Sequence, residues 1–176
     1  MIPSTSLLRA ACIVAILMSG PHLKAQTPGV TVFGTVRDMN TRDSIPFPLV
    51  TVEEIGADRP PLPIVSTARG RYEFALTEQK DYVIHYGAPN KVAKSVRMEL
   101  NGPGTEDWAT GYGMQLDITL MDSLPGIDSS VLKEPFGIAR FNKESGYYEW
   151  DLEYTRLMAE RLKALLDVYH ERDQRQ

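Results

Sequence analysis

Few side chains in this sequence have the type and spacing that site chemistry requires. His85 falls on the expected outer face of a strand and His170 on the last turn of an expected helix. They are far apart in the sequence, so nothing in their spacing indicates that they form an acid–base or metal-binding pair. Glu53 and Glu54 are adjacent on a strand, where neighbouring side chains point to opposite faces. No serine lies in a nucleophile-elbow context and no glycine-rich loop could cradle phosphate. We therefore expect no enzyme activity, no catalytic residues, no cofactor and no metal.

The segment DMNTRD, Asp38 to Asp43, has the oxygen-rich composition of a calcium loop. It lacks the Asp-x-Asp-x-Asp-Gly spacing and the terminal bidentate glutamate of such loops. Asp38 and Asn40 are also typical turn residues, because their side chains hydrogen-bond to nearby backbone amides. A structural turn is the interpretation that the spacing favours.

Two aromatic residues, Trp108 and Tyr112, lie in the glycine-punctuated segment GTEDWATGYG. Aromatic side chains in such a loop could stack on a sugar, and these two are the candidate glycan contacts. Loop aromatics also close the end of a β-sandwich, and their exposure distinguishes the two alternatives.

The first 25 residues have the features of a cleaved secretory signal: Arg9, an apolar run too short to span a bilayer, and Ala25 at the expected cleavage site. The only cysteine, Cys12, lies inside this run, so the mature chain would have no disulfide and no cysteine nucleophile. We expect an exported protein in the periplasm or associated with the outer membrane, with no transmembrane segment in the mature chain.

The charge of the chain narrows its partners. Loss of Arg9 and Lys24 reduces the 19 basic residues to 17 against 23 acidic ones, a net charge of −6. An acidic chain lacks the phosphate-neutralising charge on which nucleic-acid binding depends, and it is not attracted to anionic lipid. We expect no nucleic-acid partner.

Apolar and polar residues alternate with period two from Val30 to Met121, as in strands with one buried and one wet face. Turn clusters separate the runs, and no helical pattern intervenes. The sequence predicts a mainly β domain over 28–121, a seven-stranded antiparallel sandwich. The expected strands are 30–36, 46–54, 62–67, 71–76, 81–86, 91–100 and 113–120.

Residues 122–176 are expected to form an extended segment, a hairpin over 137–150 and one amphipathic α-helix capped by Asp151. Alternation places Tyr148 and Trp150 inward and Tyr147 outward. The apolar stripe of the helix, spaced by three and four residues, should dock it on the sandwich together with Trp150. The stripe comprises Tyr154, Leu157, Met158, Leu162, Leu165, Val168 and Tyr169.

With the strands placed, about 90 residues resemble the carboxypeptidase regulatory-like family. Its pattern runs from G-x-V-x-D through a proline-containing approach to V-x-V, then T-x-x-G-x-Y-x-F and Y-x-I. The matching residues are Gly34, Val36, Asp38, Pro46, Pro48, Val50, Val52, Thr67, Gly70, Tyr72, Phe74, Tyr82 and Ile84. The Gly-Tyr that follows in the family is replaced by Asn90-Lys91. Asn tolerates the left-handed conformation of that turn, but its aromatic residue is missing.

The resemblance implies a transthyretin-like (prealbumin-like) sandwich that is usually non-catalytic. The family recurs as accessory domains in secreted peptidases, glycan-utilisation proteins and TonB-dependent outer-membrane receptors. The tail is similar to the tails of small exported envelope proteins. We expect a binding or scaffold module of the Gram-negative cell envelope that acts through contacts with an envelope protein. Two alternatives are glycan or peptidoglycan recognition through Trp108 and Tyr112, and an accessory of an outer-membrane transport or secretion system that lends a strand edge.

Overall fold

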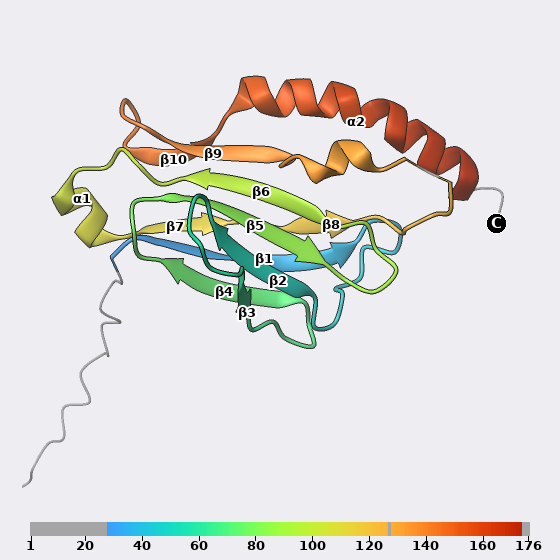
Figure 1. The fold of residues 1–176 in the computed structure, drawn as a ribbon, viewed down its shortest axis with the longest axis horizontal. Coiled ribbons are helices and arrows are strands. Elements are labelled where there is room, and N and C mark those ends of the chain that lie inside the picture. Colours follow the sequence, from blue (N-terminus) through green and yellow to red (C-terminus); the bar gives the residue numbers. More distant parts are fainter. Residues whose placement is uncertain (1–27, 127, 174–176) are drawn as a thin grey trace, which may run out of the picture.

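Two β-sheets face each other in the computed structural model, which describes residues 28–126 and 128–173 (Figure 1). The expected signal over residues 1–25 lies outside the described residues. The smaller sheet contains β4 (Arg71–Leu76), β1 (Val30–Asp38), β7 (Tyr112–Gln115) and β8 (Ile118–Leu120). The larger sheet has the order β10 (Tyr147–Trp150), β9 (Gly137–Asn142), β6 (Lys94–Glu99), β5 (Asp81–Gly87), β2 (Leu49–Glu54) and β3 (Leu62–Ile64). The helices are α1 (Thr105–Thr110), the short 3₁₀ helix η1 (Ser130–Lys133) and α2 (Leu152–Asp173).

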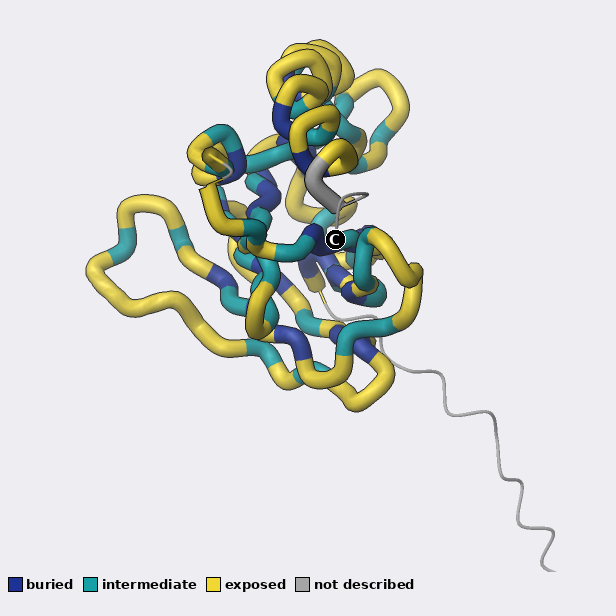
Figure 2. The backbone as a smooth tube through the Cα atoms, turned by 90° about the vertical axis from the view of Figure 1, so that its right-hand side faces the viewer, coloured by how far each residue is buried: buried dark blue, intermediate teal, exposed yellow. Residues whose placement is uncertain are grey.

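The core lies between the sheets and is built by the alternation that the sequence shows. Val30, Val32 and Val36 of β1 are buried, and so are Tyr82 and Ile84 of β5. Figure 2 shows these buried positions in dark blue inside the fold, with exposed loops around them. The expected class, a mainly β sandwich of two sheets followed by a hairpin and a C-terminal helix, is confirmed.

Strand number and pairing direction differ from the prediction. The described residues form ten strands, because the expected strand over 113–120 divides into β7 and β8 and the hairpin contributes two more. Both β7 and β8 pair with β1 in parallel, and β9 pairs with β6 in parallel, so the sandwich is not wholly antiparallel. The break lies at Asp117, whose Oδ1 accepts the Thr35 amide at 2.9 Å in place of a backbone partner.

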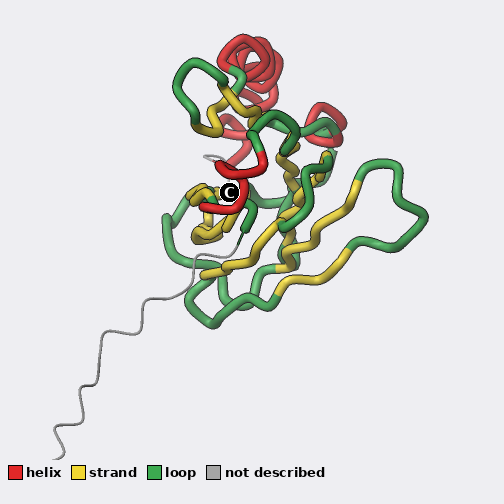
Figure 3. The backbone as a smooth tube through the Cα atoms, turned by 90° about the vertical axis from the view of Figure 1, so that its left-hand side faces the viewer, coloured by secondary structure: helices red, strands yellow, loops and turns green. Residues whose placement is uncertain are grey.

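The C-terminal hairpin extends the larger sheet. Strand β9 pairs with β6 and, in antiparallel fashion, with β10, so the hairpin covers an edge that β6 would otherwise expose. Helix η1 contacts β6, and α2 contacts β9 (Figures 1 and 3). Asp151 caps α2 as expected, because its Oδ1 accepts the Tyr154 amide at 2.9 Å. None of the helices in 28–126 and 128–173 has the length and apolar character to cross a membrane.

The buried stripe of α2 is narrower than its sequence pattern suggests. Met158, Leu165 and Tyr169 are buried, whereas Leu157 is 47% exposed and Val168 is 44% exposed. The prediction that Leu157 takes part in docking is therefore wrong. A helix lying on one strand buries a line of positions spaced mostly by four residues, and Leu157 is one position, or about 100°, away from that line. Tyr154 and Leu162 lie on the line and are half-buried.

Candidate functional site

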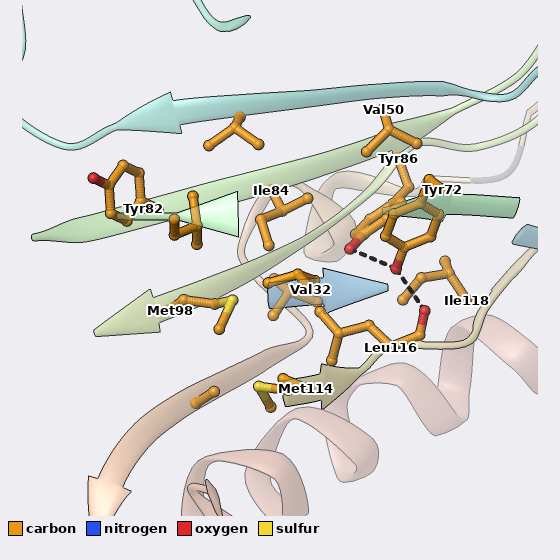
Figure 4. Packing of buried hydrophobic residues seen from close by; sticks show 14 of the residues in the cluster. Val32, Val50, Tyr72, Tyr82, Ile84, Tyr86, Met98, Met114, Leu116 and Ile118 are labelled. Carbon is orange, nitrogen blue, oxygen red and sulfur yellow. Dashed lines mark hydrogen bonds between the residues drawn. The ribbon is translucent and has the colours of Figure 1, made fainter. Parts of the chain in front are cut away.

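Two buried tyrosine hydroxyls and a backbone carbonyl form a hydrogen-bonded chain in the core (Figure 4). The Tyr72 hydroxyl donates to the carbonyl oxygen of Leu116 at 2.5 Å. Because a carbonyl only accepts, the Tyr86 hydroxyl must donate to Tyr72 Oη, 3.0 Å away. Burial raises the pKa of both tyrosines above its ordinary value. Both remain neutral near pH 7 and serve to join β4 to β5.

Gly34 of the family motif makes room for this chain. It lies opposite Tyr72 in the β1–β4 ladder. A Cβ at Gly34 would lie 1.9 Å from the Leu116 carbonyl oxygen and 3.1 Å from Tyr72 Oη. The tyrosine ring therefore crosses β1 at the one position without a side chain.

The second motif, T-x-x-G-x-Y, builds the tight turn before β4. Gly70 has φ of +69°, and its carbonyl accepts the Val36 amide at 2.9 Å. Thr67 Oγ1 accepts the Arg71 amide at 3.1 Å and so closes the turn. Within the core, Phe74 is half-buried and stacks on Tyr72 with ring centroids 6.1 Å apart. The motif residues up to this point have structural roles.

Pro46 and Tyr82 occupy the ends of two further motif elements. Pro46 is exposed in the approach to β2, outside the ladder, where its missing amide donor costs nothing. Tyr82 is 5% exposed and packs in the core. Tyr82 also borders a hollow that is lined by Glu54, Arg59 and Glu78.

The carboxylate of Asp38 forms a salt bridge with the ammonium group of Lys91. Its Oδ1 accepts the amides of Asn40 at 2.8 Å and Thr41 at 3.0 Å, and its Oδ2 pairs with Lys91. Lys91 also pairs with Asp122. Burial alone would raise the pKa of Asp38, but the hydrogen bonds from Lys91 and the two amides outweigh it and lower that pKa. The Asp38–Asp43 loop is a structural turn, as its spacing favours.

Lys91 follows Asn90, which has the expected left-handed φ of +60°. The ammonium of Lys91 joins the turn after β1 to the segment after β8. Tyr169 of α2 reaches the same cluster: its hydroxyl accepts the Asn40 side-chain amide at 2.8 Å and the Asp122 backbone amide at 3.3 Å. The C-terminal helix is thus fastened to the sandwich by polar contacts as well as by packing.

The candidate glycan residues lie at one end of the sandwich and pack against its core. Trp108 is half-buried on α1, and its Nε1 donates to the Thr77 carbonyl at 3.3 Å. Tyr112 is half-buried and meets Tyr148 edge-on with centroids 5.2 Å apart. Both rings are partly buried against the core, whereas a stacking platform is exposed. The geometry favours the structural alternative for both.

The hairpin aromatics follow the expected alternation. Tyr147 is 67% exposed, whereas Tyr148 and Trp150 are half-buried and pack against the core. The Tyr148 hydroxyl donates to the Leu100 carbonyl at 2.9 Å. Trp150 lies over Gly137, where a Cβ would be 2.8 Å from the indole ring.

The two histidines lie on separate elements. His85 Nε2 is 3.0 Å from Glu53 Oε2 on the neighbouring strand, and His170 packs edge-on against Tyr169. Among the described residues, no group of three or more His, Cys, Asp or Glu side chains is placed to hold a metal ion.

Lys94 is a half-buried basic group that the sequence pattern did not reveal. Its Nζ donates to the Thr119 carbonyl at 2.5 Å and lies 5.9 Å from the centre of the Phe136 ring. Burial lowers its pKa from the ordinary lysine value. The contact joins β6 to β8, so Lys94 fastens one sheet to the other.

Three exposed apolar residues, Phe47, Leu49 and Val65, lie at the ends of β2 and β3, at the edge of the larger sheet; we call them the β2–β3 patch. Val50 pairs with Ile64, and continuing this register sets Leu49 beside Val65. The Phe47 amide donates to the Thr67 carbonyl at 2.9 Å, which continues the same ladder. The exposed fractions are 68%, 62% and 88%. The sequence signal was available: large apolar residues stand at positions where alternation calls for polar ones.

The patch lies at the β2–β3 end of the larger sheet, away from the helices. Helix η1 contacts β6 and helix α2 contacts β9, and these strands lie toward the opposite end of the strand order from β2 and β3. The sheet edge itself is poorly suited to strand pairing, because β3 has three residues and includes Pro63. The hairpin covers the edge of β6. Strands β10 and β4 still lie at sheet edges, so the strand-lending alternative stays a prediction.

No family model matches this chain, and no curated protein matches it significantly. Several solved structures are similar to part of it. The first is a "putative carbohydrate binding protein" from Bacteroides uniformis, with TM-score 0.40 and 15% identity over 54% of this chain and 42% of the other. This chain thus spans less than half of that protein.

Two further similar structures are enzymes. Klebsiella pneumoniae 5-hydroxyisourate hydrolase has TM-score 0.37 and 12% identity over 54% of this chain and 92% of the hydrolase. The 3-chlorocatechol 1,2-dioxygenase of Rhodococcus opacus has TM-score 0.41 and 9% identity over 57% of this chain and 62% of the dioxygenase. Similarity at this level carries no argument about ligand or activity.

Proposed function

We propose that this protein is a non-catalytic, exported binding module of the carboxypeptidase regulatory-like kind. It would act in the Gram-negative cell envelope by docking an envelope protein on the β2–β3 patch. The proposal rests on one observation: three large apolar residues at the β2–β3 edge of the larger sheet are exposed, and the register sets two of them, Leu49 and Val65, opposite each other. Exposed apolar clusters on a folded domain mark interaction surfaces.

The energetics of the patch suit protein docking. Burying one such side chain is worth about 1.5–3 kcal/mol, so three together can anchor a modest interface. Phe47 adds a second indication, because it has φ of +47° between two prolines. A non-glycine residue in this region costs about 1–3 kcal/mol and persists where the surrounding structure or a function requires it.

A non-catalytic role accords with the way the reactive groups are used. Asp38 and Asp122 are paired with Lys91, and the buried tyrosine hydroxyls are consumed by Leu116 and by each other. These groups hold the fold together. They do not converge on a common cavity.

Site-specific photocrosslinking in the native envelope tests the proposal. A photoreactive residue at Leu49 or at Val65 should give the same adduct with one envelope protein, because the two positions are neighbours. Glu106, which is exposed on α1 at the end of the sandwich, is the matched control position. Excess unlabelled protein should compete the adduct away.

Adducts of equal yield from all three positions, or none from Leu49 and Val65, would contradict the proposal. An adduct between two copies of this chain would show that the patch mediates self-association, and it would contradict the proposed envelope partner. Each outcome is read from the mass and the peptide map of the adduct.

A further inference from the structure

The outer face of the smaller sheet carries chemistry that the β2–β3 patch does not explain. Phe33 lies at its centre, on β1. It is an aromatic residue at a solvent-facing strand position, and it is 39% exposed. Register places Glu73 of β4 on one side of Phe33 and Gln115 of β7 on the other. The first row across the sheet is therefore carboxylate, aromatic ring and amide.

A second row lies beside the first. Thr35 of β1 faces Arg71 of β4. On its other side, Asp117 Oδ1 accepts the Thr35 amide at 2.9 Å and Oδ2 accepts Gln115 Nε2 at 2.8 Å. Since a carboxylate only accepts, the Gln115 amide nitrogen faces Asp117 and its oxygen remains an acceptor for another group.

These two rows, together with Val65 and Thr67 from the segment before β4, line an open hollow of about 520 Å³. Neither Arg71 nor Glu73 forms a salt bridge with another residue in 28–126 or 128–173, and both are exposed, so both charged groups are available at its surface. Gly113 lies beside Phe33 and a Cβ there would come within 3.7 Å of the ring, so a larger side chain would cover it. An aromatic ring surrounded by planar polar side chains thus faces solvent.

We infer that this hollow is a binding site for a neutral oligosaccharide. The apolar face of a sugar ring packs on the Phe33 ring, which carries a negative π-face. The carboxylate of Glu73, the guanidinium of Arg71 and the amide oxygen of Gln115 hydrogen-bond to hydroxyls around the sugar. A few oriented polar groups beside an apolar surface are the general composition of a small-ligand site.

Charge selects the neutral class of sugar. The hollow combines one cation, Arg71, with two carboxylates, Glu73 and Asp117, so its net charge is negative. A uronic-acid or phosphorylated chain would be repelled, and the acidic protein as a whole adds to this repulsion. Val65 borders both this hollow and the β2–β3 patch, so the two sites adjoin, but Phe33 and Glu73 lie on the smaller sheet and Leu49 on the larger one. Because the test below uses purified protein, its outcome does not depend on the proposed protein partner.

Amide-resolved NMR titration of the purified protein tests the inference. The probes are cellohexaose, maltohexaose, xylohexaose and chitohexaose at millimolar concentration, with oligogalacturonate as the acidic comparison. We expect saturable shifts in β1, β4 and β7 with at least one neutral probe, and at least tenfold weaker binding of the acidic one.

Two variants and a control make the assignment specific. Phe33→Ala should weaken binding at least tenfold, and Gly113→Leu should weaken it similarly by covering the ring. Phe47→Ala removes an exposed phenylalanine from the other sheet and should leave the affinity unchanged. Absence of saturable shifts with all four neutral probes, shifts centred on Trp108 and Tyr112, or wild-type affinity in Phe33→Ala would each overturn the inference.

Discussion

The hydroxyl of Tyr72 reaches across β1 to the carbonyl of Leu116, at 2.5 Å, directly over Gly34. The aromatic ring fills the space that a side chain on β1 would occupy. Leu116 lies where the expected long strand divides into β7 and β8, so its carbonyl has a side-chain donor there. One tyrosine thus compensates both for a glycine in a strand and for a break in its neighbour.

Gly34→Ala is expected to destabilise the protein severely. The new Cβ would lie 1.9 Å from a backbone oxygen that cannot move without separating β1 from its parallel partner. The expected loss in unfolding free energy is on the order of 3 kcal/mol or more, as for an overpacked core. Gly87→Ala is the control, because a Cβ there meets nothing within 4 Å, and it should change the midpoint of urea unfolding little.

Removal of the two core hydroxyls should have unequal effects. Tyr72→Phe leaves the Leu116 carbonyl without its donor and Tyr86 without its acceptor, at a cost of about 1–3 kcal/mol. Tyr86→Phe removes only the outer donor of the chain and should cost less. In a double-mutant cycle by urea unfolding, the combined loss should be smaller than the sum of the single losses. Additive losses would contradict the hydrogen-bonded chain.

Lys91→Met is expected to destabilise the protein by about 1–2 kcal/mol at neutral pH, since it leaves Asp38 and Asp122 without their shared cation. The difference from wild type should depend on pH. The pKa of Asp38 is lowered in the fold, so its contribution is present above about pH 4 and is lost as pH falls through the folded pKa.

The pKa of Lys91 moves the other way. Burial alone would lower it, but the hydrogen bonds to Asp122 and Asp38 raise it above its ordinary value. Its contribution is therefore present below about pH 10.4 and is lost as pH rises through the folded pKa. Thermal unfolding across pH should show the largest gap between wild type and Lys91→Met at intermediate pH. Lys143→Met, at an exposed position, should give a small gap that does not vary in this way.

The docking of α2 should depend on its narrow buried line. Met158→Ala and Leu165→Ala are expected to cost about 2–4 kcal/mol, because both side chains are almost fully buried. Leu157→Ala should cost less than about 1 kcal/mol, since half of that side chain already faces solvent. Urea unfolding measures all three. A large effect at Leu157 would return this residue to the docking surface.

Phe47→Gly separates strain from function. Glycine adopts φ of +47° without penalty, so the relief of strain offsets the greater freedom of the unfolded chain. The unfolding free energy should therefore stay within about 1 kcal/mol of wild type. The crosslink from Leu49 should nevertheless weaken strongly. If the unfolding free energy falls by several kcal/mol, the Phe47 side chain is packed against the protein and the patch is not a free surface.

Much of the fold could be predicted because strand alternation is local information. The buried side of β1 and β5 follows from the identity of alternate residues, and Asp151 marks the start of α2. The parallel pairing of β1 with β7 has no local signal, since the face of a residue is the same whichever way its neighbour runs. The division at Asp117 depends on a side chain that bonds to Thr35 far away in the chain.

Site residues were harder to predict than strands. Trp108 and Tyr112 drew attention because loop aromatics can bind sugars, yet they pack against the core. Phe33 and Phe47 carry a signal, because each is a large apolar residue where alternation calls for a polar one, but they stand inside strand-like runs, which predict strand residues rather than site residues. The sequence showed that Lys91 departs from the family motif. Its carboxylate partners, Asp38 and Asp122, come from turns that only the folded chain brings together.

The parallel pairing of β1 also bears on the order of folding. The bond between Thr35 and Asp117 joins residues 82 positions apart, and such contacts require a large loop to close. Domains dominated by non-local pairs fold slowly, on the order of milliseconds to seconds. During synthesis, β1 has only β4 beside it until β7 and β8 are made. The first strand of the chain is therefore among the last to acquire all its neighbours.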